Sequence, residues 1–187
     1  MIPTIEDEVE RAYAALLFYN AAGMRPEEIR GLRWEDLDLD AGEGRISRAV
    51  TYAGSNKHAV IKETKTESSE RLMLLPDALV SILAPMARPA GFIIHGKRDA
   101  AGERPIPQAS FQRMVHEMQS RMGILGKYCS YDLRSTFATK AIELGQASHQ
   151  IATLMGHRDS RMAETVYARR RDKAVLDQRA AIEQLCG

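Results

Sequence analysis

Four short segments of the chain carry side chains that can bind or attack a phosphate group. Arginine guanidiniums bind phosphate oxygens through paired, charge-assisted hydrogen bonds, and a tyrosine hydroxyl can act as a nucleophile. The segments span residues 23–29, 62–71, 130–134 and 154–159, with a tyrosine shortly beyond the last. Their candidate side chains are Arg25, Lys65, Tyr131, Arg134, His157 and Tyr167.

Arg25 is expected at the start of a helix. It precedes Pro26, so its backbone should be extended, and Pro26 suits the first helical turn. Glu27 and Glu28 then lie favourably near the positive end of the helix. A guanidinium beside free helix N–H groups makes a good oxyanion site. The ordinary alternative is a surface ion pair between Arg25 and Glu28.

Tyr131 and Arg134 are expected on one face of the first turn of another helix, because they lie three residues apart. Ser130 is the expected N-cap of this helix. The arrangement would bring a second guanidinium to a second helix N-terminus. The alternative is a tyrosine packed in the core beside a surface arginine.

Lys65 falls between two expected strands, at the tip of a polar hairpin. A lysine there could reach into a neighbouring site as a proton donor, but exposed lysines at hairpin tips are also common. His157 follows Gly156, where a helix should end. Tyr167 lies on the next expected helix beside residues 169–171, which are all arginine. It is either a packed tyrosine with its hydroxyl at the rim of the core or a nucleophile.

The elements that would position these residues form a mainly helical α+β fold. Helices are expected at residues 6–22, 26–34, 77–87, 107–122, 131–144, 148–155, 160–170 and 173–185. Strands at 45–52, 58–62 and 71–75 should form a small three-stranded antiparallel sheet. Gly145 and Gly156 sit where helix C-caps would fall. No linker divides the chain, so residues 1–187 are expected to form one domain.

Composition excludes several classes of protein. There is no run of about 18 apolar residues, so no transmembrane helix is expected, and the acidic N-terminus does not resemble a signal peptide. Two cysteines are too few for a disulfide framework and favour a reducing, cytoplasmic compartment. No acidic and histidine residues have metal-ligand spacing, which disfavours a metal-dependent nuclease.

Charge is nearly balanced but unevenly distributed. The net charge is +1, and the first 40 residues hold ten acidic side chains against four arginines. Basic residues gather near the end of the chain, at Arg158, Arg161, Arg169, Arg170, Arg171 and Lys173. Such a stretch is compatible with phosphate binding and equally with a solvated helix surface.

The six candidate residues, in their order along the chain, resemble the active-site signature of the tyrosine recombinases, or phage integrases. The flanking sequence is similar too. The matching boxes are GMRPEEIRGLRWEDLDLD for the first arginine, KTESSERLMLLP for the lysine hairpin, YDLRSTFATKAIELG for the second arginine, and LMGHRDSRMAETVYAR for the histidine and tyrosine. The resemblance runs from about Gly23 to Arg170.

This resemblance implies the DNA breaking-rejoining fold and a site-specific recombinase that forms a 3′-phosphotyrosyl intermediate without a metal or cofactor. The resemblance implies that Tyr167 is the nucleophile and that Arg25 and Arg134 stabilise the charge on the phosphoryl group. It implies that Lys65 is the general acid and that His157 holds a phosphoryl oxygen or helps to deprotonate the nucleophile. Tyr131 would assist by hydrogen bonding. Tyr131 stands where many members have histidine. A phenol cannot accept and pass a proton at neutral pH as imidazole can, so no acid–base role is expected there.

The resemblance also implies partners. We expect binding to double-stranded DNA, a homotetramer on DNA, a monomer or weak oligomer without it, and a cytoplasmic location in a bacterial or phage system with no membrane contact. Family members usually carry an N-terminal core-binding domain, so this chain is expected to be the catalytic domain alone. An amphipathic helix within residues 173–187 either docks onto a neighbouring subunit or packs on its own domain.

Two alternative functions use the same fold. A type IB topoisomerase would relax supercoils instead of exchanging strands, but the box order and the short hairpin favour the recombinase. A non-catalytic DNA-binding or accessory protein would be expected to lack the lysine or the tyrosine nucleophile, and Lys65 and Tyr167 are both present.

Overall fold

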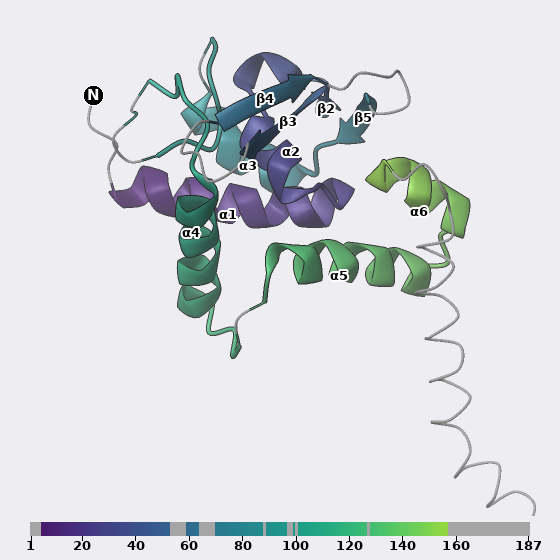
Figure 1. The fold of residues 1–187 in the computed structure, drawn as a ribbon. Coiled ribbons are helices and arrows are strands. Elements are labelled where there is room, and N and C mark those ends of the chain that lie inside the picture. The colour runs from purple at the N-terminus through teal and green to yellow at the C-terminus, as the bar shows by residue number, and fades with distance from the viewer. Residues whose placement is uncertain are drawn as a thin grey trace, which may run out of the picture. The chain divides into compact units, whose positions relative to one another are not determined.

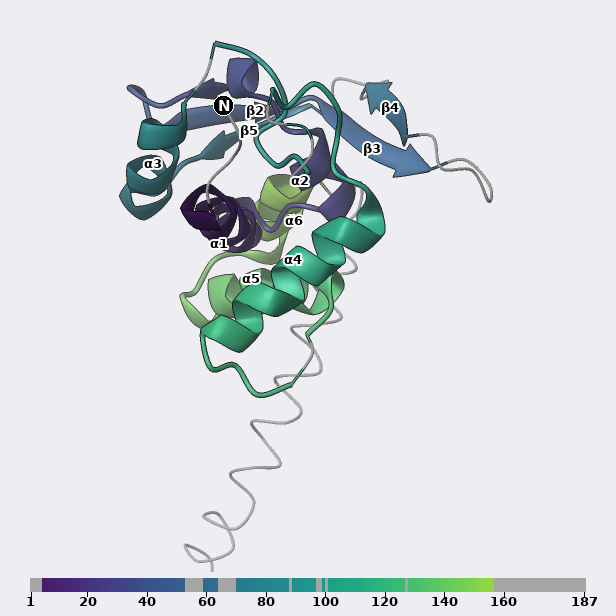
Figure 2. The same cartoon turned by 90° about the vertical axis from the view of Figure 1, so that its left-hand side faces the viewer.

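The structure is a computed structural model that describes residues 5–52, 59–63, 70–87, 89–96, 99, 101–126 and 128–156. The chain divides into two compact units, residues 1–137 and 138–187, with the division inside helix α5 (Ser130–Glu143). Most of the described elements belong to the first unit (Figures 1 and 2). The helices predicted at 160–170 and 173–185 lie outside the described residues. The assignment of residues 1–187 to one catalytic domain stays a prediction.

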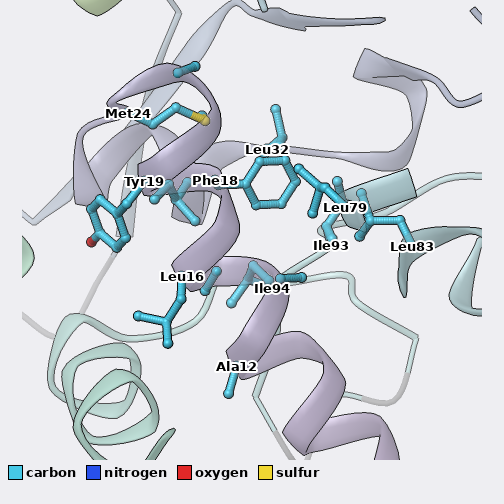
Figure 3. Close-up of a cluster of buried hydrophobic side chains, with 14 of the residues drawn as sticks. Ala12, Leu16, Phe18, Tyr19, Met24, Leu32, Leu79, Leu83, Ile93 and Ile94 are labelled. Carbon is cyan, nitrogen blue, oxygen red and sulfur yellow. The ribbon is translucent and has the colours of Figure 1, made fainter. Parts of the chain in front are cut away.

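Helix α1 (Ile5–Ala22) is the central element of the first unit and confirms the helix predicted at 6–22. It packs against α3 (Asp77–Leu83) and α4 (Gln108–Arg121). Figure 3 shows Phe18 of α1 beside Leu32 and Leu79 in this fully buried core. Gly23 ends the helix with a φ of 54°, a conformation that glycine adopts without steric cost.

Helix α2 (Pro26–Gly31) is shorter than the helix predicted at 26–34. The chain becomes extended at Leu32, whose carbonyl accepts the Ile93 N–H at 3.1 Å, and the Trp34 N–H donates to the Gly91 carbonyl at 3.0 Å. A short 3₁₀ turn, η1 (Trp34–Asp36), follows. The prediction was wrong at this end because pairing with a segment about sixty residues away replaces the last helical turn.

The strands form two small antiparallel sheets. β1 (Leu37–Asp38), β2 (Glu43–Ile46) and β5 (Arg71–Leu74) make a three-stranded sheet in the order β1-β2-β5. β3 (Arg48–Tyr52) pairs with β4 (Ala59–Glu63) in a separate two-stranded sheet of the described residues. In register, Ile46 of β2 lies opposite Arg71 of β5. The mainly helical α+β class with a small antiparallel sheet is therefore confirmed.

The single strand predicted at 45–52 is wrong, because the chain changes sheet at Ser47. β3 leaves the first sheet to pack against α2. Arg30 of α2 donates to the Val50 carbonyl at 2.7 Å, and a Cβ added to Gly31 would lie 3.1 Å from the Arg48 carbonyl oxygen. A glycine allows this close approach of helix and strand.

The remaining described helices follow the predicted pattern. α3 continues into the 3₁₀ turn η3 (Ala84–Met86), and together they cover most of the helix predicted at 77–87. α4 and α5 match the helices predicted at 107–122 and 131–144 within a residue at each end. None of the helices in the described part of the chain has both the length and the apolar character that a bilayer crossing needs.

In the second unit, α6 (Ser148–Met155) confirms the helix predicted at 148–155. Its apolar residues Ile151, Ala152 and Met155 are buried. Gly145 and Gly156 have φ values of 81° and 63°, so both occupy the left-handed conformation expected of a residue that ends a helix.

Candidate active site

Arg25 stands at the N-terminus of α2, as its sequence context predicts. Its backbone is extended (φ −77°, ψ 149°), and its carbonyl accepts the N–H groups of Glu28 and Ile29, both at 3.0 Å. Pro26 occupies the first helical turn, where a missing N–H costs nothing. The side chain of Arg25 is 37% exposed, so it lies at the edge of the protein rather than inside it.

Glu28 is the acceptor around which this part of the site is built. Its carboxylate accepts the Arg25 backbone N–H at 2.7 Å and Arg25 Nη1 at 2.8 Å. It also accepts Arg71 Nη1 at 3.1 Å and Arg71 Nη2 at 2.8 Å. The ion pair between Arg25 and Glu28 that sequence offers as an ordinary alternative therefore exists. It is part of a larger cluster, because a second guanidinium binds the same carboxylate.

The ionisation of Glu28 reflects this environment. Burial by itself raises the pKa of the carboxyl group, but the hydrogen bonds and charge of Arg71, together with those of Arg25, outweigh burial and lower the pKa from its usual 4.5. Glu28 therefore stays ionised in the folded protein at neutral pH. It holds two arginines in place.

Arg134 brings a third guanidinium to the same cluster. It is buried, and its Nη1 donates a hydrogen bond to the carbonyl of Gly23, two residues before Arg25. Burial lowers the pKa of Arg134 to about 10, and the charges of Arg25 and Arg71 act in the same direction, whereas Glu28 opposes them. The guanidinium thus remains protonated at neutral pH. Two arginines separated by more than a hundred residues of sequence meet at the Gly23–Arg25 turn.

The first turn of α5 carries Arg134 and Tyr131. Cys129, rather than the predicted Ser130, is the N-cap, because its carbonyl accepts the N–H groups of Asp132 and Leu133 at 3.0 and 3.2 Å. Asp132 Oδ2 accepts the Cys129 N–H at 2.8 Å, and hydrogen bonds from Cys129 lower the pKa of Asp132. Ser130 is instead the first helical residue and is buried.

Tyr131 is 59% exposed, so the alternative of a tyrosine packed in the core is wrong. The alternative of a surface arginine is wrong as well, since Arg134 is the buried member of the pair. The phenol of Tyr131 lies within electrostatic reach of the Arg134 guanidinium. An exposed hydroxyl beside a buried cation suits hydrogen bonding to an anion that approaches from solvent.

The structure therefore brings together three of the six residues that the sequence singles out: Arg25, Tyr131 and Arg134. Lys65, His157 and Tyr167 lie outside the described residues. Their assignments stay predictions.

Sequence reasoning missed two members of the cluster. Arg71 ends the segment proposed for the lysine hairpin but was given no role, and Glu28 was considered only as a surface partner. The sequence feature that could have indicated this role is the charged Arg71 as the first residue of the apolar strand RLML. A charged residue that is buried needs a partner.

Among the described residues, three guanidiniums and one carboxylate give this cluster a net positive charge. A net positive charge favours an anion, and arginine is well suited to two oxygens of a phosphate at once. Among the described residues, no three His, Cys, Asp or Glu side chains gather where they could hold a metal ion. The chemistry that this arrangement supports is the binding of a phosphate group at the starts of α2 and α5.

The comparison with protein families decides which class of protein carries this site. Residues 2–174 match the sequence model of the phage integrase family. The chain belongs to this family. The resemblance drawn from the sequence motifs is thereby confirmed.

Solved structures share the fold of this phage integrase family member. The Tn1549 transposon integrase, solved in complex with circular intermediate DNA, superimposes with a TM-score of 0.68 at 20% identity, covering 87% of this chain and 59% of that one. The XerA recombinase gives a TM-score of 0.64 at 17% identity, covering 89% and 58%.

Curated relatives are tyrosine recombinases. XerC of Xanthomonas axonopodis pv. citri is 26% identical over 164 residues, covering 84% of this chain and 47% of the relative. A XerC-like protein of Caldanaerobacter subterraneus subsp. tengcongensis is 23% identical over 178 residues, covering 84% and 45%. The chain spans about half the length of the curated relatives it matches.

The ionisation of Glu28 leads to a prediction about stability and pH. Because its folded pKa is lowered, Glu28 contributes stability above its usual pKa of 4.5 and loses that contribution as the pH falls below it. Glu28→Gln should therefore destabilise the protein by on the order of 3 kcal/mol at neutral pH. The difference between the two proteins should shrink in acid, as measured by urea unfolding across pH. A difference that does not change with pH would contradict an ionised Glu28.

Proposed function

We propose that this chain is the catalytic domain of a tyrosine-type site-specific DNA recombinase, which cleaves and rejoins double-stranded DNA. The observation that carries the proposal is the meeting of Arg25 and Arg134 at the turn that precedes α2, in a member of the phage integrase family. A scissile phosphate bound there would have its non-bridging oxygens held by fixed guanidiniums. Such pre-positioned charge stabilises the phosphoryl transition state most strongly.

The proposed reaction is an exchange of phosphate esters. Tyr167 Oη loses its proton and bonds to the scissile phosphorus, while the bond from phosphorus to the 5′ oxygen breaks and Lys65 protonates the leaving oxygen. His157 helps to remove the phenol proton or holds a phosphoryl oxygen. Because one ester replaces another, the 5′-hydroxyl of a partner strand can reverse the step without an external energy source.

Tyr131 and Arg71 complete the proposed phosphate environment. The exposed Tyr131 hydroxyl donates a hydrogen bond to a phosphoryl oxygen, a role that needs no proton transfer. Arg71 binds the same Glu28 carboxylate as Arg25. It adds positive charge to the cluster.

Double-stranded DNA is the proposed partner, and the active form is a homotetramer on DNA in the cytoplasm. The Tn1549 integrase, which shares the fold, was solved in complex with DNA, and this supports a DNA substrate here. The basic residues near the end of the chain, from Arg158 to Lys173, would contribute contacts with the DNA backbone.

Trapping on a nicked DNA duplex tests the proposal. A nick just beyond the scissile phosphate lets the short 5′-hydroxyl fragment diffuse away, so the rejoining step cannot occur and the covalent intermediate accumulates. We expect a protein–DNA adduct that survives denaturation and whose modified peptide maps to Tyr167. An adduct on another residue would contradict the assignment of the nucleophile. No adduct on nicked duplexes that carry the chain's own recombination site would contradict the proposed function.

A further inference from the structure

Arg71 and Glu28 form a largely buried ion pair with two hydrogen bonds, between elements that are 43 residues apart in sequence. The side chains are 9% and 7% exposed. The neighbouring pair of Arg45 and Glu70, by contrast, is 65% and 39% exposed and joined by one hydrogen bond of 2.9 Å. Removing two charges from water is costly and offsets much of their attraction, so such a pair adds little net stability while its hydrogen bonds fix the geometry of both side chains.

The hydrogen bonds of Glu28 connect Arg71 to Arg25. Oε1 accepts Nη1 of both arginines, at 2.8 Å from Arg25 and 3.1 Å from Arg71. Oε2 accepts the Arg25 backbone N–H at 2.7 Å and Arg71 Nη2 at 2.8 Å. Each carboxylate oxygen is thus shared between the two arginines. The carboxylate cannot rotate without breaking contacts to both.

Arg25 is the more exposed of the two arginines. Its side chain is 37% exposed, so packing restrains it less than it restrains Arg71 at 9%. If the two bonds from Arg71 were lost, Glu28 would keep a buried charge and gain freedom to turn toward solvent. The Arg25 guanidinium would then lose the fixed carboxylate that it shares with Arg71.

We propose that Arg71 is a positioning residue for the recombinase reaction, acting through Glu28 to fix the guanidinium of Arg25 against the scissile phosphate. This inference rests on the proposed function. Arg71 also lies six residues after Lys65 in sequence, which offers a second route to the chemistry, through the general acid. The contacts favour the route through Glu28, since among the described residues the hydrogen bonds of that carboxylate go to Arg25 and Arg71.

Arg71→Lys keeps the charge but cannot supply two parallel hydrogen bonds. In single-turnover cleavage of the nicked duplex, we expect this variant to lose about 10–100-fold in rate, the range seen when a residue that orients a functional group is changed. DNA affinity should change little. Glu28→Gln should lose rate similarly, and the double variant should lose no more than the worse single variant, because both act through one contact. Arg45→Lys is the matched control and should keep the wild-type rate.

A duplex with sulfur in place of the 5′ bridging oxygen distinguishes the two routes. A thiolate leaves without a proton donor, because a thiol has a pKa near 8.5. We expect the sulfur substrate not to restore the rate of Arg71→Lys. Restoration would overturn the proposal, because it would place the effect on protonation of the leaving group. The proposal would also be overturned if the rate losses of Arg71→Lys and Glu28→Gln were fully additive in the double variant, or if Arg71→Lys cleaved at the wild-type rate.

Hydrogen exchange gives a readout that does not depend on activity. The Arg25 backbone N–H donates to Glu28, so its exchange reports whether the carboxylate is held. We expect this amide to exchange faster in Arg71→Lys than in the wild type and in Arg45→Lys. An unchanged exchange rate of this amide in Arg71→Lys would contradict the positioning role. A wild-type chain that forms no tyrosine adduct would instead contradict the proposed function.

Discussion

Replacing Tyr167 with phenylalanine is expected to abolish the covalent protein–DNA adduct while leaving DNA binding unchanged. The substitution removes a single oxygen, the atom that would bond to phosphorus, and keeps the aromatic ring. The three guanidiniums near the start of α2 keep their charge in this variant, so they should bind the phosphate as before. Adduct formation is measured on the nicked duplex after denaturation, and binding is measured by gel-shift titration.

Tyr131→Phe is the matched control for this experiment. It removes the hydroxyl of an exposed tyrosine in the candidate site, so it should still form the adduct, more slowly than the wild type. An adduct that survives denaturation in Tyr167→Phe would show that another residue is the nucleophile. If the adduct were lost in Tyr131→Phe but formed in Tyr167→Phe, Tyr131 would be the nucleophile instead of Tyr167.

Arg134→Lys is expected to lower the rate of DNA cleavage by about 10²–10³-fold, the usual effect of removing one pre-positioned donor to a transition-state oxygen. Nη1 of Arg134 already donates a hydrogen bond to the carbonyl of Gly23. A lysine has a single nitrogen, so it cannot hold that carbonyl and also bind a phosphoryl oxygen with fixed geometry. Single-turnover cleavage at saturating protein concentration measures the effect on chemistry alone.

A buried arginine can also be important only for folding, so this prediction needs a matched control. Arg11 of α1 is equally buried and has no proposed part in the reaction. Arg11→Lys should lower the midpoint of urea unfolding, yet the folded variant should cleave at the wild-type rate. Equal rate losses in the two variants, or a full rate in Arg134→Lys, would contradict a direct role of Arg134 at the phosphate.

Several features of the site could be predicted because their causes are local. Pro26 excludes the helical conformation for the residue before it, so the extended backbone of Arg25 follows from one neighbour. Gly145 and Gly156 end their helices for a similarly local reason, since glycine accepts a positive φ. The ordered motifs likewise identified the family, which the match over residues 2–174 confirms.

Other features could not be predicted because they depend on contacts between distant segments. The helix predicted through Trp34 ends at Gly31 because residues 91–93 pair with the chain beyond it. The strand predicted at 45–52 divides at Ser47 because β3 packs on α2 while β2 pairs with β5. In both segments the local sequence preferences favoured the predicted element, and tertiary contacts overrode them.

For the candidate site, the sequence alone determined which residue types were available and where the helix that follows Arg25 begins. The tertiary structure decided which of these residues are buried and which groups share a charge. The meeting of Arg71 with Glu28, and of Arg134 with the Gly23 carbonyl, requires chain segments separated by 43 and 111 residues to pack together. Steric rules act between chain neighbours, whereas burial and ion pairing depend on where distant segments pack.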